Sequence, residues 1–359
     1  MLSRFFLFSL AFLASTALAQ TWTSCNPLNE TCQPDTALGT TALFNFTNAA
    51  TADTTIWNTT AGTVNYELDG AEFTINGKGD SPTLQSNFYI FFGQVSVVMR
   101  AASGTGIVSS IVLQSDDLDE IDWEWIGGNH THTQSNYFGK GNTTSYDRAV
   151  WHPVNDPQDV YHNYTTIWTS EKLEWWIDDN LQRTLTYEDA TWGTSTPMNL
   201  RIGVWAGGDP TSNSNGTVEW AGGTVDYSKA PFTQTVQSVY VQDYSSGSTY
   251  TYGDHSGSHQ SIKIASGNST IAERLSKPRG VVQRWKALSH VAQIAIMCSA
   301  LGVGLAFIAT IIFCCIRNRR AGRKERAVAD AEWEKEVTEL NDYKRAFASE
   351  KEIHPRGFF

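Results

Sequence analysis

Short runs in which apolar and polar residues alternate recur along most of this chain, separated by clusters of Gly, Asn, Ser and Asp. A period of two places the apolar side chains on one face of a β-strand, and many short strands between turn signals are typical of a sandwich. No long stretch with the 3.6-residue period of a helix interrupts them before residue 265. We therefore expect one all-β sandwich over residues 20–265, with strands at residues 64–68, 72–75, 95–100, 107–113, 121–126, 165–168, 173–177, 200–205 and 236–241.

The first residues of the chain have a different pattern. Arg4 precedes a short apolar run at residues 5–13, and the small residues Ala17 and Ala19 flank Leu18 just before Gln20. This order of charge, apolar run and small-x-small site is typical of a secretory signal peptide, which we expect to span residues 1–19. The rest of the chain is then expected to enter an oxidising compartment.

A second apolar run, at residues 291–316, carries no charge and is long enough to cross a bilayer as a helix. Six basic residues follow between positions 317 and 326, which predicts a cytoplasmic side for residues 317–359. Residues 266–290 then form a stalk. We expect a single-pass protein of the plasma membrane, its N-terminal side outside the cell. Residues 327–351 suit either an amphipathic helix or a solvated disordered tail.

Cysteines and glycosylation signals agree with this topology. Cys25 and Cys32 lie close together, where a secreted domain is expected to form a local disulfide, whereas the other three cysteines lie in or beside the second apolar run. All Asn-X-Ser/Thr signals precede that run, as expected for a glycosylated ectodomain. They begin at Asn29, Asn45, Asn58, Asn129, Asn142, Asn163, Asn215 and Asn268.

Charge and motif content exclude several classes of function. The net charge is −11, and the part before the second apolar run is acidic, which argues against binding to nucleic acid or to polyanions. The chain has no Cys/His spacing of a zinc site and no phosphate-binding glycine motif, so we expect neither a metal nor a cofactor. A neutral polymer is compatible with this charge.

The segment DEIDWEW at residues 119–125 carries the candidate chemistry. In a strand, Glu120, Asp122 and Glu124 share one face, while the apolar residues between them point to the other. Like charges on one sheet face are destabilising, so a purely structural strand would avoid this pattern. The pattern is explained by an active site in which one carboxylate is a nucleophile and another, with a raised pKa, donates a proton.

These residues also carry a family likeness. Residues 119–124 resemble the catalytic signature of glycoside hydrolase family 16, and the flanking sequence looks like its fungal Crh subgroup of cell-wall transglycosylases. The matching segments are residues 104–110, 113–117, 124–128, 133–138, 161–164, 173–178, 201–208 and 218–223. The resemblance implies a curved, concanavalin-like β-jelly-roll sandwich with substrate on its concave face. Many relatives end in a glycolipid-anchor signal, from which this chain departs.

The resemblance further implies a retaining reaction. Glu120 would be the nucleophile, Glu124 the general acid/base, and Asp122 the auxiliary residue that orients and tunes the nucleophile. Retention requires two carboxyl groups about 5–5.5 Å apart, whereas residues i and i+4 of a flat strand have Cα atoms about 13 Å apart. The two Glu side chains must therefore lean together, and a negative Asp122 would help to keep Glu124 protonated.

Aromatic and polar residues in the matching segments are candidates for sugar binding. Flat indole faces favour Trp205 and Trp220 as platforms, whereas we assign Trp123, Trp125 and Trp168 to the core. Each polar candidate can equally serve a turn or the sheet, and His162 can equally bond a catalytic carboxylate. The remaining candidates are Tyr137, Tyr161, Gln134, Asn136, His162 and Arg201.

The sequence thus predicts a retaining transglycosylase that cleaves β-1,4-linked chitin and transfers it to β-glucan or chitin in the fungal cell wall. A β-glucanase or chitinase that mainly hydrolyses is an alternative of the same class. A non-catalytic carbohydrate-binding wall sensor is an alternative of another class, which the pair Glu120 and Glu124 argues against.

Overall fold

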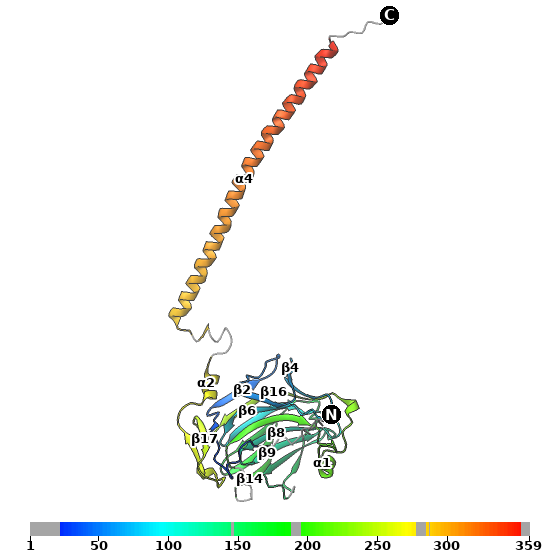
Figure 1. The fold of residues 1–359 in the computed structure, drawn as a ribbon, viewed down its shortest axis with the longest axis vertical. Helices are drawn as coiled ribbons and strands as arrows, with labels where there is room; N and C mark the ends of the chain where they lie inside the picture. Colours follow the sequence, from blue (N-terminus) through cyan, green and yellow to red (C-terminus); the bar gives the residue numbers. More distant parts are fainter. Residues whose placement is uncertain (1–21, 145–146, 188–194, 278–284, 287, 353–359) are drawn as a thin grey trace, which may run out of the picture. The chain divides into compact units, whose positions relative to one another are not determined.

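The computed structural model describes residues 22–144, 147–187, 195–277, 285–286 and 288–352 (Figure 1). The expected signal peptide at residues 1–19 and the last residues of the expected tail, 353–359, lie outside this part. The chain divides into two units, one ending at Lys277 and the other beginning at Pro278, and each is described by itself.

The first unit is built on a seven-stranded antiparallel sheet, whose strands follow the order β11-β10-β9-β8-β15-β6-β3. The strands are β3 (Trp57–Ala61), β6 (Thr83–Ile90), β8 (Val108–Ser115), β9 (Glu120–Ile126), β10 (His132–Phe138), β11 (Val150–Pro153) and β15 (Met198–Trp205).

A second antiparallel sheet has the strand order β14-β13-β12-β7-β16-β5-β4, with β2 paired to β16. Its strands are β2 (Thr41–Asn45), β4 (Val64–Tyr66), β5 (Ala71–Ile75), β7 (Gly93–Arg100), β12 (His162–Trp168), β13 (Lys172–Ile177), β14 (Asn180–Thr186) and β16 (Phe232–Asp243). Three further strands, β1 (Asp35–Thr36), β17 (Thr249–Tyr252) and β18 (Ile262–Ala265), form a small third sheet. Short helices α1 (Asn215–Trp220), η1 (Tyr227–Lys229), η2 (His259–Ser261) and α2 (Thr270–Ser276) connect them.

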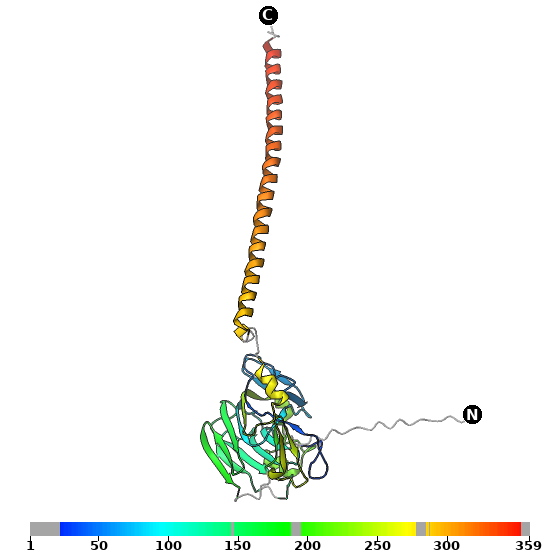
Figure 2. The same cartoon turned by 90° about the vertical axis from the view of Figure 1, so that its left-hand side faces the viewer.

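The two large sheets stack as curved layers, as Figures 1 and 2 show. The core lies between them: Trp123 and Trp125 of β9 pack against Tyr164 of β12, with ring centroids 5.6 and 4.5 Å from that of the tyrosine. Trp168 is also fully buried, so all three tryptophans assigned to the core lie there. The sandwich predicted from the alternating runs is confirmed.

Each of the nine predicted strands is present, with ends shifted by up to four residues. The strands that the sequence pattern did not reveal include β10 and β14. Their segments, HTQSNYF and NLQRTLT, contain few apolar residues, so the alternation between their two faces is weak.

The compact unit extends past the expected boundary at residue 265. Ser269 is buried and its side chain caps α2 by accepting a hydrogen bond from the amide of Ala272. Ile271 enters the core, and Arg274 lies 3.0 Å from the carboxylate of Asp53. The segment expected as a stalk is therefore anchored to the sandwich as far as Lys277.

The structure confirms the disulfide between Cys25 and Cys32, whose Cα atoms are 5.9 Å apart. Of the predicted glycosylation sites, Asn129 and Asn163 are half-buried. The others have exposed side chains, which glycosylation requires, and they stay predictions: Asn29, Asn45, Asn58, Asn142, Asn215 and Asn268.

The second unit is dominated by helix α4 (His290–Glu352). Among the described residues it is the one helix long and apolar enough to cross a membrane, by length and composition. The helix contains the expected span at residues 291–316 and continues through residues 327–351, so that segment is helical.

Candidate active site

Strand β9 presents its three acidic side chains on one face, as its alternation predicts. Glu120 and Glu124 are half-buried and Asp122 is buried, whereas the apolar residues between them belong to the core. The indole Nε1 of Trp175, from the other sheet, donates to the carbonyl of Asp122 over 3.1 Å. We name the face that carries Glu120, Asp122 and Glu124 the carboxylate face.

A buried ion pair holds the beginning of β9. The ammonium of Lys140 lies 2.6 Å from Asp119 and 2.7 Å from Asp117, two carboxylates with no exposed surface. The hydroxyl of Thr196 also donates to Asp119, over 3.0 Å. Buried charges with these partners define a fixed position, so the residue directly before Glu120 is locked in place.

Burial raises the pKa of all three carboxyl groups on the carboxylate face. The pKa of Glu120 rises to about 7, because burial outweighs the hydrogen bond from Asp122 and the positive charge of Arg201. The pKa of Glu124 rises to about 8, through burial and then the charge of Glu120. Of the two glutamates, Glu120 therefore ionises first as pH rises, and Glu124 keeps its proton to higher pH.

The pKa of Asp122 does not agree with the expectation that Asp122 would be a negatively charged neighbour of Glu124. Its pKa is raised well above the ordinary range by burial and by the charges of Glu120 and Glu124. A side-chain hydrogen bond links it to Glu120, raising the pKa of Asp122 and lowering that of Glu120. Asp122 is thus the proton donor of this bond, and the charge that raises the pKa of Glu124 is that of Glu120.

Neighbouring strands surround the carboxylates with polar side chains. In the β10 register, Gln134 lies opposite Glu124 and Asn136 lies opposite Asp122. Arg201 of β15 pairs with Val112 of β8, and Val112 pairs with Asp122, so Arg201 and Asp122 lie on the same face of the sheet. These three residues predicted from the sequence therefore lie on the carboxylate face.

Trp205 and Trp220 lie together at the Glu124 end of this face. Their rings stack with centroids 6.1 Å apart, and both are half-buried outside the main core. The indole of Trp205 donates to the hydroxyl of Ser110 over 3.2 Å, and that of Trp220 donates to Gln134 over 3.1 Å. Both hydrogen-bond partners lie in register with Glu124, so the two tryptophans border the acid/base candidate.

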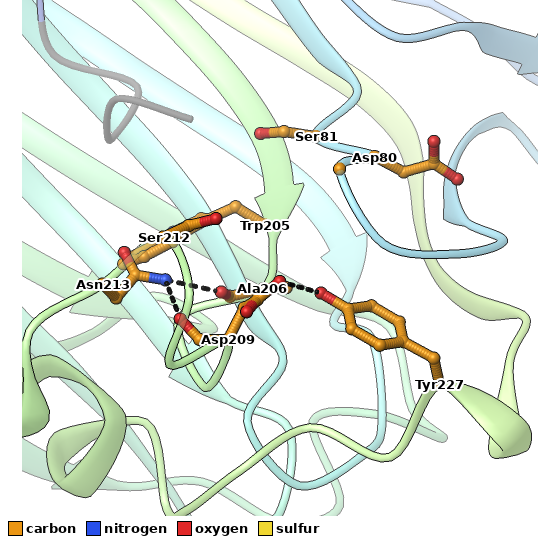
Figure 3. Close-up of a pocket in the computed structure, with 9 residues that line it drawn as sticks. Asp80, Ser81, Trp205, Ala206, Asp209, Ser212, Asn213 and Tyr227 are labelled. Atoms are coloured by element: carbon orange, nitrogen blue, oxygen red, sulfur yellow. Dashed lines mark hydrogen bonds between the residues drawn. The ribbon is translucent and has the colours of Figure 1, made fainter. Parts of the chain in front are cut away.

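The turn after β15 positions Trp205 (Figure 3). Asn213 donates to the carbonyls of Ala206 and Asp209, and the hydroxyl of Tyr227 donates to the carboxylate of Asp209 over 2.9 Å. This turn lines a narrow pocket that contains none of the three β9 carboxylates. Its lining residues are Gly79, Asp80, Ser81, Trp205, Ala206, Asp209, Ser212, Asn213 and Tyr227.

Three sequence candidates lie elsewhere, and the structure removes them from the site. Tyr137 is in register with Ile121 and belongs to the core, because β10 turns it away from the carboxylate face. Tyr161 directly precedes β12, and its ring centre lies 5.2 Å from the guanidinium carbon of Arg100, in β7 of the other sheet. His162 bonds the carboxylate of Asp178 over 2.6 Å and the carbonyl of Asn155, which is the structural alternative for this histidine.

Two exposed tryptophans near the carboxylate face were not among the candidates predicted from the sequence. Trp151 of β11, 42% exposed, lies in register with Gln134 and therefore on the carboxylate face. Trp22, 44% exposed, donates its amide to Gln114, which is in register with Glu120. Neither lies in a predicted strand. The position of Trp151 follows from the pairing of β11 with β10, and that of Trp22 from its hydrogen bonds to Gln114 and Arg201.

Comparisons with known proteins identify the family. The model of glycosyl hydrolases family 16 matches residues 51–222. Crh-like protein 3 of Aspergillus fumigatus is 51% identical over 96% of this chain and 97% of its own length. Crh-like protein 2 of Botryotinia fuckeliana is 52% identical over 94% of this chain and 75% of its own length. The chain belongs to glycosyl hydrolase family 16.

Solved structures agree with this membership. The Crh5 transglycosylase without ligand is 53% identical, with a TM-score of 0.64 over 67% of this chain and 100% of that chain. A second structure of Crh5, in complex with NAG, has the same identity and TM-score. The family and these likenesses make this protein a glycosidase or transglycosylase of the Crh-like group, with the jelly-roll sandwich expected from the sequence.

Removing the hydrogen-bond donor at Asp122 should shift the acidic side of the plot of kcat/KM against pH. In Asp122→Ala the hydrogen bond that stabilises ionised Glu120 is lost, so the pKa of Glu120 rises and the rise of kcat/KM shifts to higher pH. Asp122→Asn keeps an N–H donor and should shift less, with a reduced rate. The measurement is kcat/KM against pH from 4 to 9. An acid limb that is identical in wild type and Asp122→Ala would contradict this role.

Trp205→Ala should damage catalysis more than folding. The side chain is half-buried in a small satellite cluster, so we expect a smaller stability cost than the about 3–5 kcal/mol of a core tryptophan, and a loss of about tenfold in kcat/KM. Trp123→Ala, which leaves a cavity in the core, is the matched control for the melting temperature. If Trp205→Ala has near-normal kinetics and its melting temperature falls as much as that of Trp123→Ala, the role of Trp205 is structural.

Proposed function

We propose that this protein is a retaining transglycosylase that cleaves β-1,4-linked chitin and transfers the released chain to β-glucan or chitin, cross-linking the cell wall. The observation that carries the proposal is the pair of glutamates on one strand face, with the pKa of Glu124 raised further than that of Glu120. The likeness to the Crh5 transglycosylase, one structure of which is a complex with NAG, supports chitin, a polymer of N-acetylglucosamine.

In the first step, a carboxylate oxygen of Glu120 attacks C1 of the donor sugar. The bond from C1 to the glycosidic oxygen breaks while Glu124 gives its proton to that oxygen. The products are a glycosyl ester on Glu120, a free leaving chain and an ionised Glu124. Asp122, protonated, keeps its hydrogen bond to Glu120 and so orients the attacking carboxylate.

In the second step, Glu124 acts as the base. It takes the proton of an acceptor hydroxyl, whose oxygen attacks C1 and displaces Glu120. Water as acceptor gives hydrolysis, whereas a sugar hydroxyl gives a new glycosidic bond. A sugar held beside Glu124 competes with water because its hydroxyl is already positioned. Trp205, Trp220 and Gln134 border Glu124 and are suited to hold such a sugar.

An acceptor competition assay tests the proposal. The full-length protein in detergent is incubated with chitin oligosaccharides and fluorescent β-1,3-glucan oligosaccharides. We expect fluorescent products longer than the labelled acceptor. If only new reducing ends accumulate, the protein is a hydrolase. If it binds chitin with no turnover at all, it is a carbohydrate-binding sensor.

We further propose that residues 291–316 remain in the plasma membrane as a single span, with the basic cluster that follows in the cytosol. Guanidinium groups beside an apolar helix are costly to move through a bilayer, so they halt transfer. A C-terminal epitope should persist in the mature protein, and phospholipase treatment that releases glycolipid-anchored proteins should leave it in the membrane. Loss of that epitope on maturation would show removal of the apolar helix.

A further inference from the structure

A cluster of polar side chains lies directly before the nucleophile candidate, and none of them takes part in the proposed mechanism. We name it the Asp119 cluster; its members are Ser115, Asp117, Asp119, Lys140 and Thr196, and all but Lys140 are buried. Asp119 immediately precedes Glu120, the first residue of β9. Because successive side chains of a strand point to opposite faces, Asp119 is turned away from the carboxylate face. The cluster can therefore hold Glu120 from behind, on the side of the sheet away from the substrate.

Lys140 connects the turn before β9 with the segment after β10. Its backbone amide donates to Oδ1 of Asp119 over 2.9 Å, and its ammonium donates to Oδ2 of the same carboxylate over 2.6 Å. The ammonium also lies 2.7 Å from the carboxylate of Asp117. In the ladder between β9 and β10, Glu120 lies opposite Phe138, and Lys140 follows Phe138 by two residues. Lys140 thus fixes the end of the ladder at which Glu120 lies.

Two further segments contact Asp119. The amide of Ser195 and the hydroxyl of Thr196, just before β15, donate to Oδ2 of Asp119, each over 3.0 Å. The amide of Asp119 donates to the hydroxyl of Ser115, the last residue of β8, over 2.8 Å. Asp119 is therefore held from β8, β10 and β15, which are strands of the same sheet as β9. A shift of the beginning of β9 would disturb the contacts to all three.

The turn that carries Asp119 has a strained backbone. Leu118 has a φ of 66°, a left-handed conformation that is unfavourable for a residue with a side chain of this size. Its carbonyl accepts from the amide of Gly141, the residue after Lys140, over 2.7 Å. Such conformations persist only where the surrounding contacts enforce them. Without the Lys140 ammonium the turn is expected to relax, and Glu120, two residues after Leu118, to move with it.

Lys140 also compensates the charge of two buried carboxylates. The side chains of Asp117 and Asp119 have no exposed surface, whereas that of Lys140 is 25% exposed. Breaking a buried ion pair leaves an uncompensated charge and is destabilising. A neutral residue at position 140 is therefore expected to lower stability, and this effect has to be separated from a loss of position. Asp117→Asn in a Lys140→Met background removes one carboxylate charge but does not restore the link to Asp119.

We propose that Lys140 is a positioning residue of this enzyme, which acts through Asp119 to hold Glu120 where it can attack C1 of the donor sugar. The proposal rests on the proposed function, in which Glu120 is the nucleophile. A misplacement of about 1 Å can lower a rate about 10²-fold. Because the Asp119 cluster lies behind Glu120, the affinity for the donor should depend little on Lys140.

The test follows the first turnover of the full-length protein in detergent, with an aryl β-glycoside of a chitin oligosaccharide as donor. Release of the aryl alcohol reports the attack by Glu120, whatever acceptor later takes the sugar. We expect Lys140→Met to lower the rate constant at saturating donor about 10²-fold and to change the half-saturating donor concentration less than about twofold. In Lys140→Met/Asp117→Asn the melting temperature should partly recover, while the rate constant stays low.

Tyr250→Phe is the matched control. It removes a buried hydrogen bond outside the Asp119 cluster, from the hydroxyl of Tyr250 to Asp243 over 2.6 Å, and should lower the melting temperature without changing the rate constant. If Lys140→Met fails to fold, Thr196→Val takes its place, because it removes only a hydroxyl donor from the cluster. We expect Thr196→Val to lower the rate constant about tenfold.

Three results would overturn the positioning role. The first is a rate constant of Lys140→Met, or of Thr196→Val in its place, within about twofold of that of wild type. The second is recovery of the rate constant together with the melting temperature in Lys140→Met/Asp117→Asn, which would make the effect one of charge and stability. The third is a loss that appears only in the half-saturating donor concentration.

The outcome is separable from that of the proposed function. If wild type releases the aryl alcohol and makes no glucan-linked product, but Lys140→Met is slow, the positioning role holds and the transferase proposal fails. If wild type makes glucan-linked product and Lys140→Met reacts at the rate of wild type, the reverse is true. No aryl release by wild type would contradict the attack of Glu120 on a chitin donor and would overturn both.

Discussion

Glu120→Gln should abolish both transfer and hydrolysis. The amide cannot form the glycosyl ester, and removal of a nucleophile typically costs at least about a thousandfold in kcat. The carboxylate that is lost is the one whose ionised form the hydrogen bond from Asp122 and the charge of Arg201 stabilise against the effect of burial. The measurement is product formation from chitin oligosaccharides by chromatography.

The fold is expected to survive this change, because Glu120 is half-buried and points away from the core. An unchanged melting temperature therefore serves as the control. Glu120→Gln should stay inactive with a donor whose leaving group needs no proton, since the missing step is the attack on C1. Turnover of such a donor by Glu120→Gln would contradict the assignment of Glu120 as the nucleophile.

Glu124→Gln should lose about 10²–10⁴-fold on natural sugars, which is the usual contribution of a general acid. It should recover ester formation with an activated donor, because a good leaving group departs without a proton. The contrast with Glu120→Gln separates the two roles. Identical responses of the two variants to the activated donor would remove the distinction between nucleophile and acid/base.

The same variant should change how stability depends on pH. The folded-state pKa of Glu124, about 8, lies above its ordinary value of 4.5, so folding favours the neutral form. The associated stability is fully present below pH 4.5 and is lost as pH rises through about 8. Glutamine does not titrate, so the melting temperature of Glu124→Gln should fall less than that of wild type between pH 6 and 9. Parallel curves would contradict the raised pKa.

Local pattern was sufficient for the nine predicted strands and for the carboxylate face. The period of two in residues 120–125 separates acidic from apolar side chains whatever the rest of the fold does, because successive side chains of a strand point to opposite faces. The same argument assigned Trp123 and Trp125 to the core, where they lie. The disulfide between Cys25 and Cys32 was likewise predictable from proximity in a secreted sequence.

The tertiary structure determines which other residues lie on the carboxylate face. Tyr137 adjoins Asn136, but the register of β10 sends it into the core. Trp22 lies far from Arg201 in sequence, and only the strand order that puts β15 beside β8 brings both to Glu120. The raised pKa of Asp122 also follows from its burial between two carboxylates. Strand faces follow from neighbours along the chain, whereas neighbours across a sheet and desolvation depend on segments far apart in sequence.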